Sequence, residues 1–182
     1  MTQRVLHPPV VVMGVQGSGK STIAELLASR TGGRAVDGDR LHPADNVARM
    51  AAGVPLSDAD REPWLRTIGD LLDAHRGDNI VVVCSALRRN YRDLLRDRAP
   101  GTVFVHLSGS FELISERVDA RTHEYMPPAL LRSQFASLEP LEPDEDGIVI
   151  DVAAAPVRIV DEAVAFLDEH ARRVSGGAAS SR

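Results

Sequence analysis

Residues 14–21 read Gly14-Val15-Gln16-Gly17-Ser18-Gly19-Lys20-Ser21, a glycine-rich turn that ends in Lys-Ser. The stretch fits the pattern GxxxxGK followed by Ser or Thr, in which successive backbone N–H groups point inward at phosphate oxygens. A chance glycine turn would fit the same pattern. However, residues 10–13 form a short apolar run typical of a buried strand, and residues 21–30 carry apolar side chains at helical spacing. This strand–turn–helix context favours a phosphate-binding loop.

The residue types in this loop suit a nucleotide. Lys20 is expected to reach the β- and γ-phosphates, the Ser21 hydroxyl is expected to bind Mg²⁺, and the helix that follows contributes the positive end of its dipole. The residues expected to contact ATP are Gly14, Gln16, Gly17, Ser18, Gly19, Lys20, Ser21 and Thr22. The chain has no Asn-Lys-x-Asp run of the kind that recognises guanine, and it is too short for an ATPase motor. The motif therefore favours a small-molecule kinase.

Apolar runs and helical patterns alternate along the rest of the chain. Further strands are expected at 34–36, 80–84, 103–107 and 148–152, and helices at 43–50, from Asp60 as a cap, around 91–95, at 111–118 and at 156–173. The alternation predicts one α/β domain over residues 1–174, a P-loop kinase fold with a five-stranded parallel sheet and helices on both faces. Two polar segments interrupt it, a substrate-binding insert at about 39–62 and a lid at about 121–147. The tail, residues 175–182, lacks apolar side chains and is expected to be disordered.

Composition excludes several other classes of protein. The net charge of −5 and the pI of about 5.7 argue against a nucleic-acid partner, which would favour a basic domain with clustered Lys and Arg. No apolar run approaches the roughly 20 residues needed to span a bilayer, so no membrane association is expected. The single cysteine, Cys84, cannot form an internal disulfide, which fits a reducing compartment and a cytoplasmic location. Cys84 is interpreted as a buried apolar residue, and Trp64 as part of the core.

An acidic pair, Asp37-Gly38-Asp39, follows the second predicted strand. Ligands of open α/β sheets bind outside the carboxyl ends of the strands, so both carboxylates could face one crevice. One could hold Mg²⁺ through water, and the other could accept the proton of a substrate hydroxyl. An Asx-type turn that closes the strand is the alternative interpretation.

Four stretches together resemble the gluconokinase family, the small P-loop type related in fold to shikimate and nucleoside-monophosphate kinases. They are MGVQGSGKST at 13–22, DGDRLHPADNVARMAAGVPLSDADREPWL at 37–65, CSALRRNYRDLLR at 84–96 and PPALLRSQFASLEPLEPDE at 127–145. The second is the most specific, because related kinases share the phosphate loop but not DGDxLHP or PLxDxDRxPWL. The resemblance implies ATP-dependent phosphorylation of D-gluconate to 6-phospho-D-gluconate, with Mg²⁺ and, by analogy, a homodimer.

The resemblance also implies roles for individual residues. Asp37 would support Mg²⁺, and Asp39 would contact the substrate and act as the base. Arg117 and Arg121 would belong to a lid helix that closes over the phosphates, with Arg121 taking part in catalysis. The residues implied to lie in or near the gluconate pocket are Asp39, His42, Asn46, Arg49, Arg61, Arg88 and Gln134. Arg88 is favoured as the cation for the substrate carboxylate.

The lid departs from the family pattern Arg-x-x-His-Phe-Met-Pro, because His123-Glu124-Tyr125 places the histidine one residue early. No role is therefore assigned to His123. Two alternative functions stay open, a kinase for another small acid such as shikimate and a non-catalytic nucleotide-binding sensor. The DGDRLHP stretch disfavours the first. The presence of Lys20 and both aspartates disfavours the second.

Overall fold

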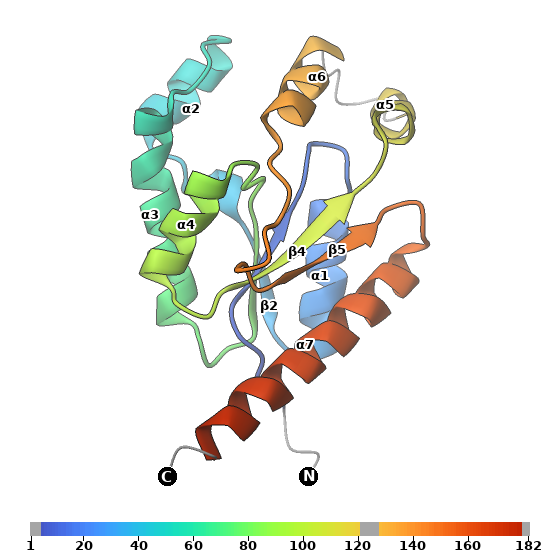
Figure 1. The fold of residues 1–182 in the computed structure, drawn as a ribbon. Helices are drawn as coiled ribbons and strands as arrows, with labels where there is room; N and C mark the ends of the chain where they lie inside the picture. Colours follow the sequence, from blue (N-terminus) through green and yellow to red (C-terminus); the bar gives the residue numbers. More distant parts are fainter. Residues whose placement is uncertain (1–4, 121–127, 180–182) are drawn as a thin grey trace.

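A five-stranded parallel sheet forms the centre of the protein, with the strand order β2-β3-β1-β4-β5 (Figure 1). The computed structural model describes residues 5–120 and 128–179. The strands are β1 (Val10–Met13), β2 (Arg34–Asp37), β3 (Ile80–Val83), β4 (Val103–Ser108) and β5 (Gly147–Asp151). All five strands predicted from the sequence are confirmed.

Helices cover both faces of this sheet, as predicted. The helices are α1 (Lys20–Thr31), α2 (Ala44–Ala51), α3 (Asp58–Ala74), α4 (Arg89–Arg98), α5 (Phe111–Asp119), α6 (Pro128–Ser137) and α7 (Pro156–Ala179), with a 3₁₀ turn, η1, at Gly38–Leu41. Helices α1 and α7 pack on one face, and α3 and α4 pack on the other (Figure 1). Strands β1 and β3 are continuous runs of buried apolar side chains because both of their faces are covered in this way.

The carboxyl ends of the strands share one edge of the sheet because all strands are parallel. Helices α2, α5 and α6 lie beyond this edge (Figure 1). The loop 14–19 follows β1, η1 follows β2, and residues 84–88 follow β3. The fold therefore brings three of the four stretches named above to one end of the sheet.

Three local features differ from the sequence expectations. Helix α3 is capped by Ser57, not Asp60, because Ser57 and Asp60 form a reciprocal capping box in which Asp60 is the third helical residue. The segment predicted to be a lid contains helix α6. Helix α7 continues to Ala179, so residues 175–179 are helical where disorder was expected, because extending an existing helix costs far less than starting one.

Arg121 and the atypical stretch 123–125 lie outside the described residues. None of the helices in the described part combines the length and apolar character that a bilayer span needs.

His106 is an unusual component of the core. It lies in β4 beside Met13 of β1 and Val149 of β5, and it is 4% exposed. Neither ring nitrogen has a hydrogen-bond partner among the described residues. Burial, and then the positive charge of Arg92, lower the pKa of His106 to about 4. The folded protein therefore holds this imidazole neutral.

We expect His106 to make the protein less stable as the pH falls from about 6.5 to about 4. In that range the unfolded chain binds a proton at this imidazole and the folded chain does not, so the free energy of unfolding falls by up to about 1.4 kcal/mol per pH unit. Urea unfolding at pH 6.5 and pH 5 should show a loss roughly 1.5 kcal/mol smaller in His106→Leu than in the wild type. Equal losses in the two proteins would contradict this assignment.

Candidate active site

The phosphate loop follows β1 and leads directly into α1. Gly14 approaches the neighbouring strand closely: a Cβ atom there would lie 2.6 Å from the carbonyl oxygen of Leu107. Gly19, the N-cap of α1, has φ 93°, and a Cβ atom there would meet nothing within 4 Å. No described side chain caps α1 with a hydrogen bond, and this end of the helix carries the positive end of the helix dipole. This arrangement fits a bound phosphate group.

Two side chains of the loop are turned toward its interior. The Lys20 ammonium donates a hydrogen bond to the carbonyl oxygen of Val15 across the loop, at 3.0 Å. The Ser18 hydroxyl is buried with no partner among the described residues. The hydroxyl group of Ser21, in contrast, belongs to an exposed residue at the start of α1. Ser21 can therefore take part in binding a cation at the mouth of the loop.

The acidic pair lies beside the phosphate loop, at the end of β2. The Asp37 carboxylate accepts a hydrogen bond from the backbone N–H of Asp39 at 3.0 Å, so a short Asx-type turn is present, as the alternative interpretation proposed. The turn and a ligand role are compatible, because Asp39 interacts electrostatically with Lys20 of the phosphate loop and with His42 of the insert. The carboxyl group of Asp39 thus lies where the phosphate loop and the insert meet.

The pKa of Asp39 is raised above its ordinary value. The largest cause is loss of hydration, followed by the negative charge of Asp37, while Lys20 and His42 act in the opposite direction. The residue is nevertheless exposed, so a substrate can reach it. A carboxylate with a raised pKa and open access has the properties of a general base.

Trp64 supports this acidic turn from the core side. Its indole N–H donates to the carbonyl oxygen of Gly38 at 2.7 Å, and its ring stacks on His42 with 4.0 Å between centroids. Burial is the main cause that lowers the pKa of His42 below its ordinary value. The negative charge of Asp39 opposes this shift, and the positive charge of Arg61 adds to it. His42 is therefore a neutral group held beside Asp39.

A cluster of two arginines flanks Tyr91 at the start of α4. The guanidinium carbons of Arg61 and Arg88 lie 5.8 and 6.0 Å from the centre of the Tyr91 ring. The Tyr91 hydroxyl donates to Asp58 at 2.5 Å, and Arg88 pairs with the same carboxylate at 3.3 Å. We call Asp58, Arg61, Arg88 and Tyr91 the arginine cluster. Both side chains of the Arg88–Asp58 pair are partly exposed, so an incoming anion can compete for the arginine.

The remaining predicted residues are distributed around this site. The side-chain amide of buried Asn46 donates to the carbonyl oxygen of Asp60 at 2.7 Å and so holds the insert together. Arg49 pairs with Asp60 at 3.3 Å, outside the arginine cluster. The side-chain oxygen of Gln134, on α6, accepts a hydrogen bond from the backbone N–H of Gln16 at 2.6 Å. Gln134 therefore lies over the phosphate loop.

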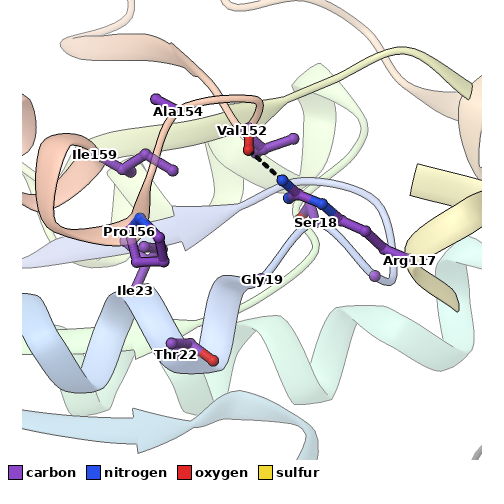
Figure 2. Close-up of a pocket in the computed structure, with 10 residues that line it drawn as sticks. Ser18, Gly19, Thr22, Ile23, Arg117, Val152, Ala154, Pro156 and Ile159 are labelled. Carbon is purple, nitrogen blue, oxygen red and sulfur yellow. Dashed lines mark hydrogen bonds between the residues drawn. The ribbon is translucent and has the colours of Figure 1, made fainter. Parts of the chain in front are cut away.

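A cavity of about 230 Å³ lies on the other side of the loop, between α1 and the start of α7 (Figure 2). Arg117 of α5 reaches over it and donates to the carbonyl oxygen of Val152 at 2.6 Å. The side chains of Ile23, Pro156 and Ile159 form its apolar wall. A cavity with an apolar wall and an arginine next to a phosphate loop suits the base of a nucleotide.

The residues present fit a magnesium ion only together with phosphate ligands. No group of three His, Cys, Asp or Glu side chains forms a metal site within residues 5–120 and 128–179. Mg²⁺ commonly uses one or two protein oxygens, with phosphates and waters completing its shell, and Ser21 and Asp37 supply such oxygens.

Cys84 was interpreted as a buried apolar residue. Burial raises the pKa of its thiol to about 12, which agrees with an inert buried side chain.

Comparison with known proteins identifies the family. The chain is 42% identical over 149 residues to the thermoresistant gluconokinase of Escherichia coli, covering 80% of this chain and 85% of that protein. The chain belongs to the gluconokinase family. A solved gluconokinase from Sinorhizobium meliloti superposes with a TM-score of 0.87 at 42% identity, covering 96% of this chain and 99% of that one. An unliganded sugar kinase from Janibacter gives 0.83 at 46% identity, covering 89% and 95%.

The family model that matches residues 16–168 is described as shikimate kinase. This match agrees with the predicted P-loop kinase fold, and it shows that the chain is a nucleotide-dependent kinase. Within that wider fold, the 42% identity to gluconokinases assigns this chain to the gluconokinase family. The family resemblance proposed from the sequence stretches is thereby confirmed.

Two residues of the site were not predicted from the sequence as functional. Trp64 was interpreted as core, which its 5% exposure confirms, but it also supports Gly38 and His42. Tyr91 was used only to mark a helix. The available signal was its spacing. Tyr91 follows Arg88 by three residues at the start of α4, and residues about one helical turn apart lie on one side of a helix, so Tyr91 could have been expected beside Arg88.

Proposed function

We propose that this protein transfers the γ-phosphoryl group of ATP to D-gluconate, giving 6-phospho-D-gluconate and ADP. The observation that carries the proposal is membership of the gluconokinase family over most of the chain. The site is consistent with it, because a phosphate loop, a candidate base and a pair of arginines lie along adjoining strand ends. A cytoplasmic location, a homodimer and a single catalytic domain are part of the same proposal.

Phosphoryl transfer depends mainly on positioning and on electrostatic stabilisation. The backbone N–H groups at the start of α1 and the Lys20 ammonium would hold the β- and γ-phosphates. Ser21 and Asp37 would hold Mg²⁺, which supplies charge neutralisation on the phosphate oxygens when bound. The cavity beneath Arg117 would hold the adenine base.

The acceptor would occupy the crevice between the phosphate loop and the arginine cluster. Asp39 would accept the proton of the attacking hydroxyl, with His42 beside it. Arg61 and Arg88 would pair with the carboxylate at the other end of the substrate, since guanidinium groups bind carboxylates with matched geometry. Gln134, which contacts the phosphate loop through Gln16, would line the crevice from α6.

ADP formation by the purified protein with ATP and Mg²⁺ tests the function directly. We expect it to depend on D-gluconate, with shikimate giving only the rate seen without an acceptor. Lys20→Ala should fold normally and lower the rate by roughly a hundredfold or more, because a preorganised charge-stabilising group is lost. Equal rates with shikimate, or no response to gluconate, would contradict the proposal. Full activity in a folded Lys20→Ala protein would contradict the phosphate-loop assignment.

A further inference from the structure

Arg92, in the middle of α4, is a buried charge that the proposed mechanism does not use. Its side chain and that of Glu145 are both 0% exposed. The two form a bidentate pair, with Nε 2.6 Å from Oε1 and Nη2 2.9 Å from Oε2. Burial alone would raise the pKa of Glu145, but the hydrogen bonds from Arg92 keep that pKa below its ordinary value. The pair is therefore ionised in the folded protein.

The same guanidinium also binds backbone carbonyl groups from two irregular segments. Its Nη atoms donate to the carbonyl oxygens of Ala86 at 3.2 Å, Leu87 at 3.3 Å, Glu139 at 3.1 Å and Pro140 at 3.0 Å. The first two belong to the loop that follows β3, and the other two belong to the segment that follows α6. Together with Glu145, these acceptors satisfy the planar array of donors that arginine presents.

Other hydrogen bonds join the same two segments. The backbone N–H of Glu139 donates to the carbonyl oxygen of Leu87 at 2.8 Å, and the backbone N–H of Arg89 donates to the Glu139 carboxylate. Ala86, which is buried, has φ 43°, a conformation that side chains other than glycine rarely adopt. Such backbone strain persists only where the surroundings hold it in place, and Arg92 is part of those surroundings.

Each segment leads to a different side of the active site. The loop after β3 ends at Arg88, in the arginine cluster. The segment after α6 continues from the helix that carries Gln134, which contacts the phosphate loop at Gln16. Arg92 thus joins a loop that leads to the arginine cluster to a segment that leads to the phosphate loop.

We propose that Arg92, held by Glu145, is a positioning residue for phosphoryl transfer. It fixes the loop that ends in Arg88 against the segment that follows α6, and so it sets the arginine cluster relative to the phosphate loop. Stability alone does not require such a pair, because apolar side chains of similar volume often stabilise a core equally well. The inference rests on the proposed function, since it concerns the gluconate end of the crevice.

Two variants test this role. Glu145→Gln keeps the shape of the side chain and removes its charge, whereas Arg92→Lys keeps the charge but offers three donors on a flexible stem. We expect kcat/KM for gluconate to fall roughly 10- to 100-fold in each, mainly through a higher KM for gluconate, because small misplacements of substrate-positioning groups have effects of that size. The Kd for ATP, measured without gluconate, should stay within about twofold of the wild-type value, because the phosphate loop is held by β1 and α1.

Two variants elsewhere on α4 serve as controls. Leu95→Val removes one buried methylene group, and Arg98→Met breaks the ion pair with Asp70. Both should lower the Tm without changing the KM for gluconate. If Glu145→Gln and Arg92→Lys behave like these controls, lose ATP affinity in parallel, or both fail to fold, Arg92 has only a structural role and the inference is overturned.

The wild-type protein assayed in parallel separates this inference from the function on which it rests. Absence of gluconate-dependent ADP formation in the wild type would count against the proposed function. An active wild type with unchanged kinetics in both variants would count against Arg92 alone.

Discussion

Gluconate should be phosphorylated roughly a thousandfold better than glucose, measured as kcat/KM. Gluconate is an open chain that ends in a carboxylate, and glucose offers no anion to Arg61 and Arg88. A hydrogen bond to a charged group contributes roughly 1.5–3 kcal/mol, so two such contacts amount to a preference of roughly 10²–10⁴. Gluconate must displace Asp58 from Arg88, but this costs little, because an ion pair between partly exposed side chains contributes about 1 kcal/mol or less.

Arg88→Ala should reduce that preference by roughly 10- to 100-fold, since Arg61 remains beside Tyr91, and it should leave the ATP affinity unchanged. Arg66→Ala is a matched control, because Arg66 pairs with Glu62 on the exposed side of α3. The measurement is kcat/KM for both sugars in a coupled ADP assay. Comparable rates with glucose in the wild type would refute the gluconate assignment. If Arg88→Ala keeps the full preference for gluconate over glucose, the substrate carboxylate is bound by Arg61 or by Arg49 instead.

The strands and the phosphate loop could be predicted because their signals are local. Unbroken runs such as Val10–Met13 indicate strands buried on both faces, and the glycine pattern after it determines the backbone of the loop. Bounds of helices were less predictable where two residues compete for one role. Ser57 and Asp60 are both good caps, and only the reciprocal capping box shows which of them begins α3.

Contacts between distant segments could not be predicted from patterns along the chain. Arg92 belongs to a charged stretch, RRNYRDLLRDR, in which no arginine is distinguished by its spacing. Its complete burial depends on Glu145, which is 53 residues away in the sequence. Similarly, the stacking of His42 on Trp64 and the place of Gln134 over Gln16 depend on how the insert and α6 fold back over the sheet edge.

Substitution of Asp39 should have the largest effect of any single carboxylate. Asp39→Asn keeps the size of the side chain but cannot accept the proton of the substrate hydroxyl. We expect kcat to fall roughly 10²–10⁴-fold while the Kd for ATP is unchanged, because general bases contribute about that much. Asp45→Asn, in the exposed first turn of α2, is the matched control and should keep its activity.

The pH dependence of the wild type provides an independent test of the same residue. Because loss of hydration and the charge of Asp37 raise the pKa of Asp39, the carboxyl group stays protonated to a higher pH than an ordinary aspartate. A protonated carboxyl group cannot act as the base, so kcat should fall as the pH decreases through this raised pKa, and the residual rate of Asp39→Asn should lack that fall. Asp37→Asn removes the second cause of the shift and should move the acid limb to lower pH, apart from any loss of Mg²⁺ binding. A normal kcat in Asp39→Asn would assign the base to Asp37, or would show that the reaction needs no base, as a loose transition state for phosphoryl transfer permits.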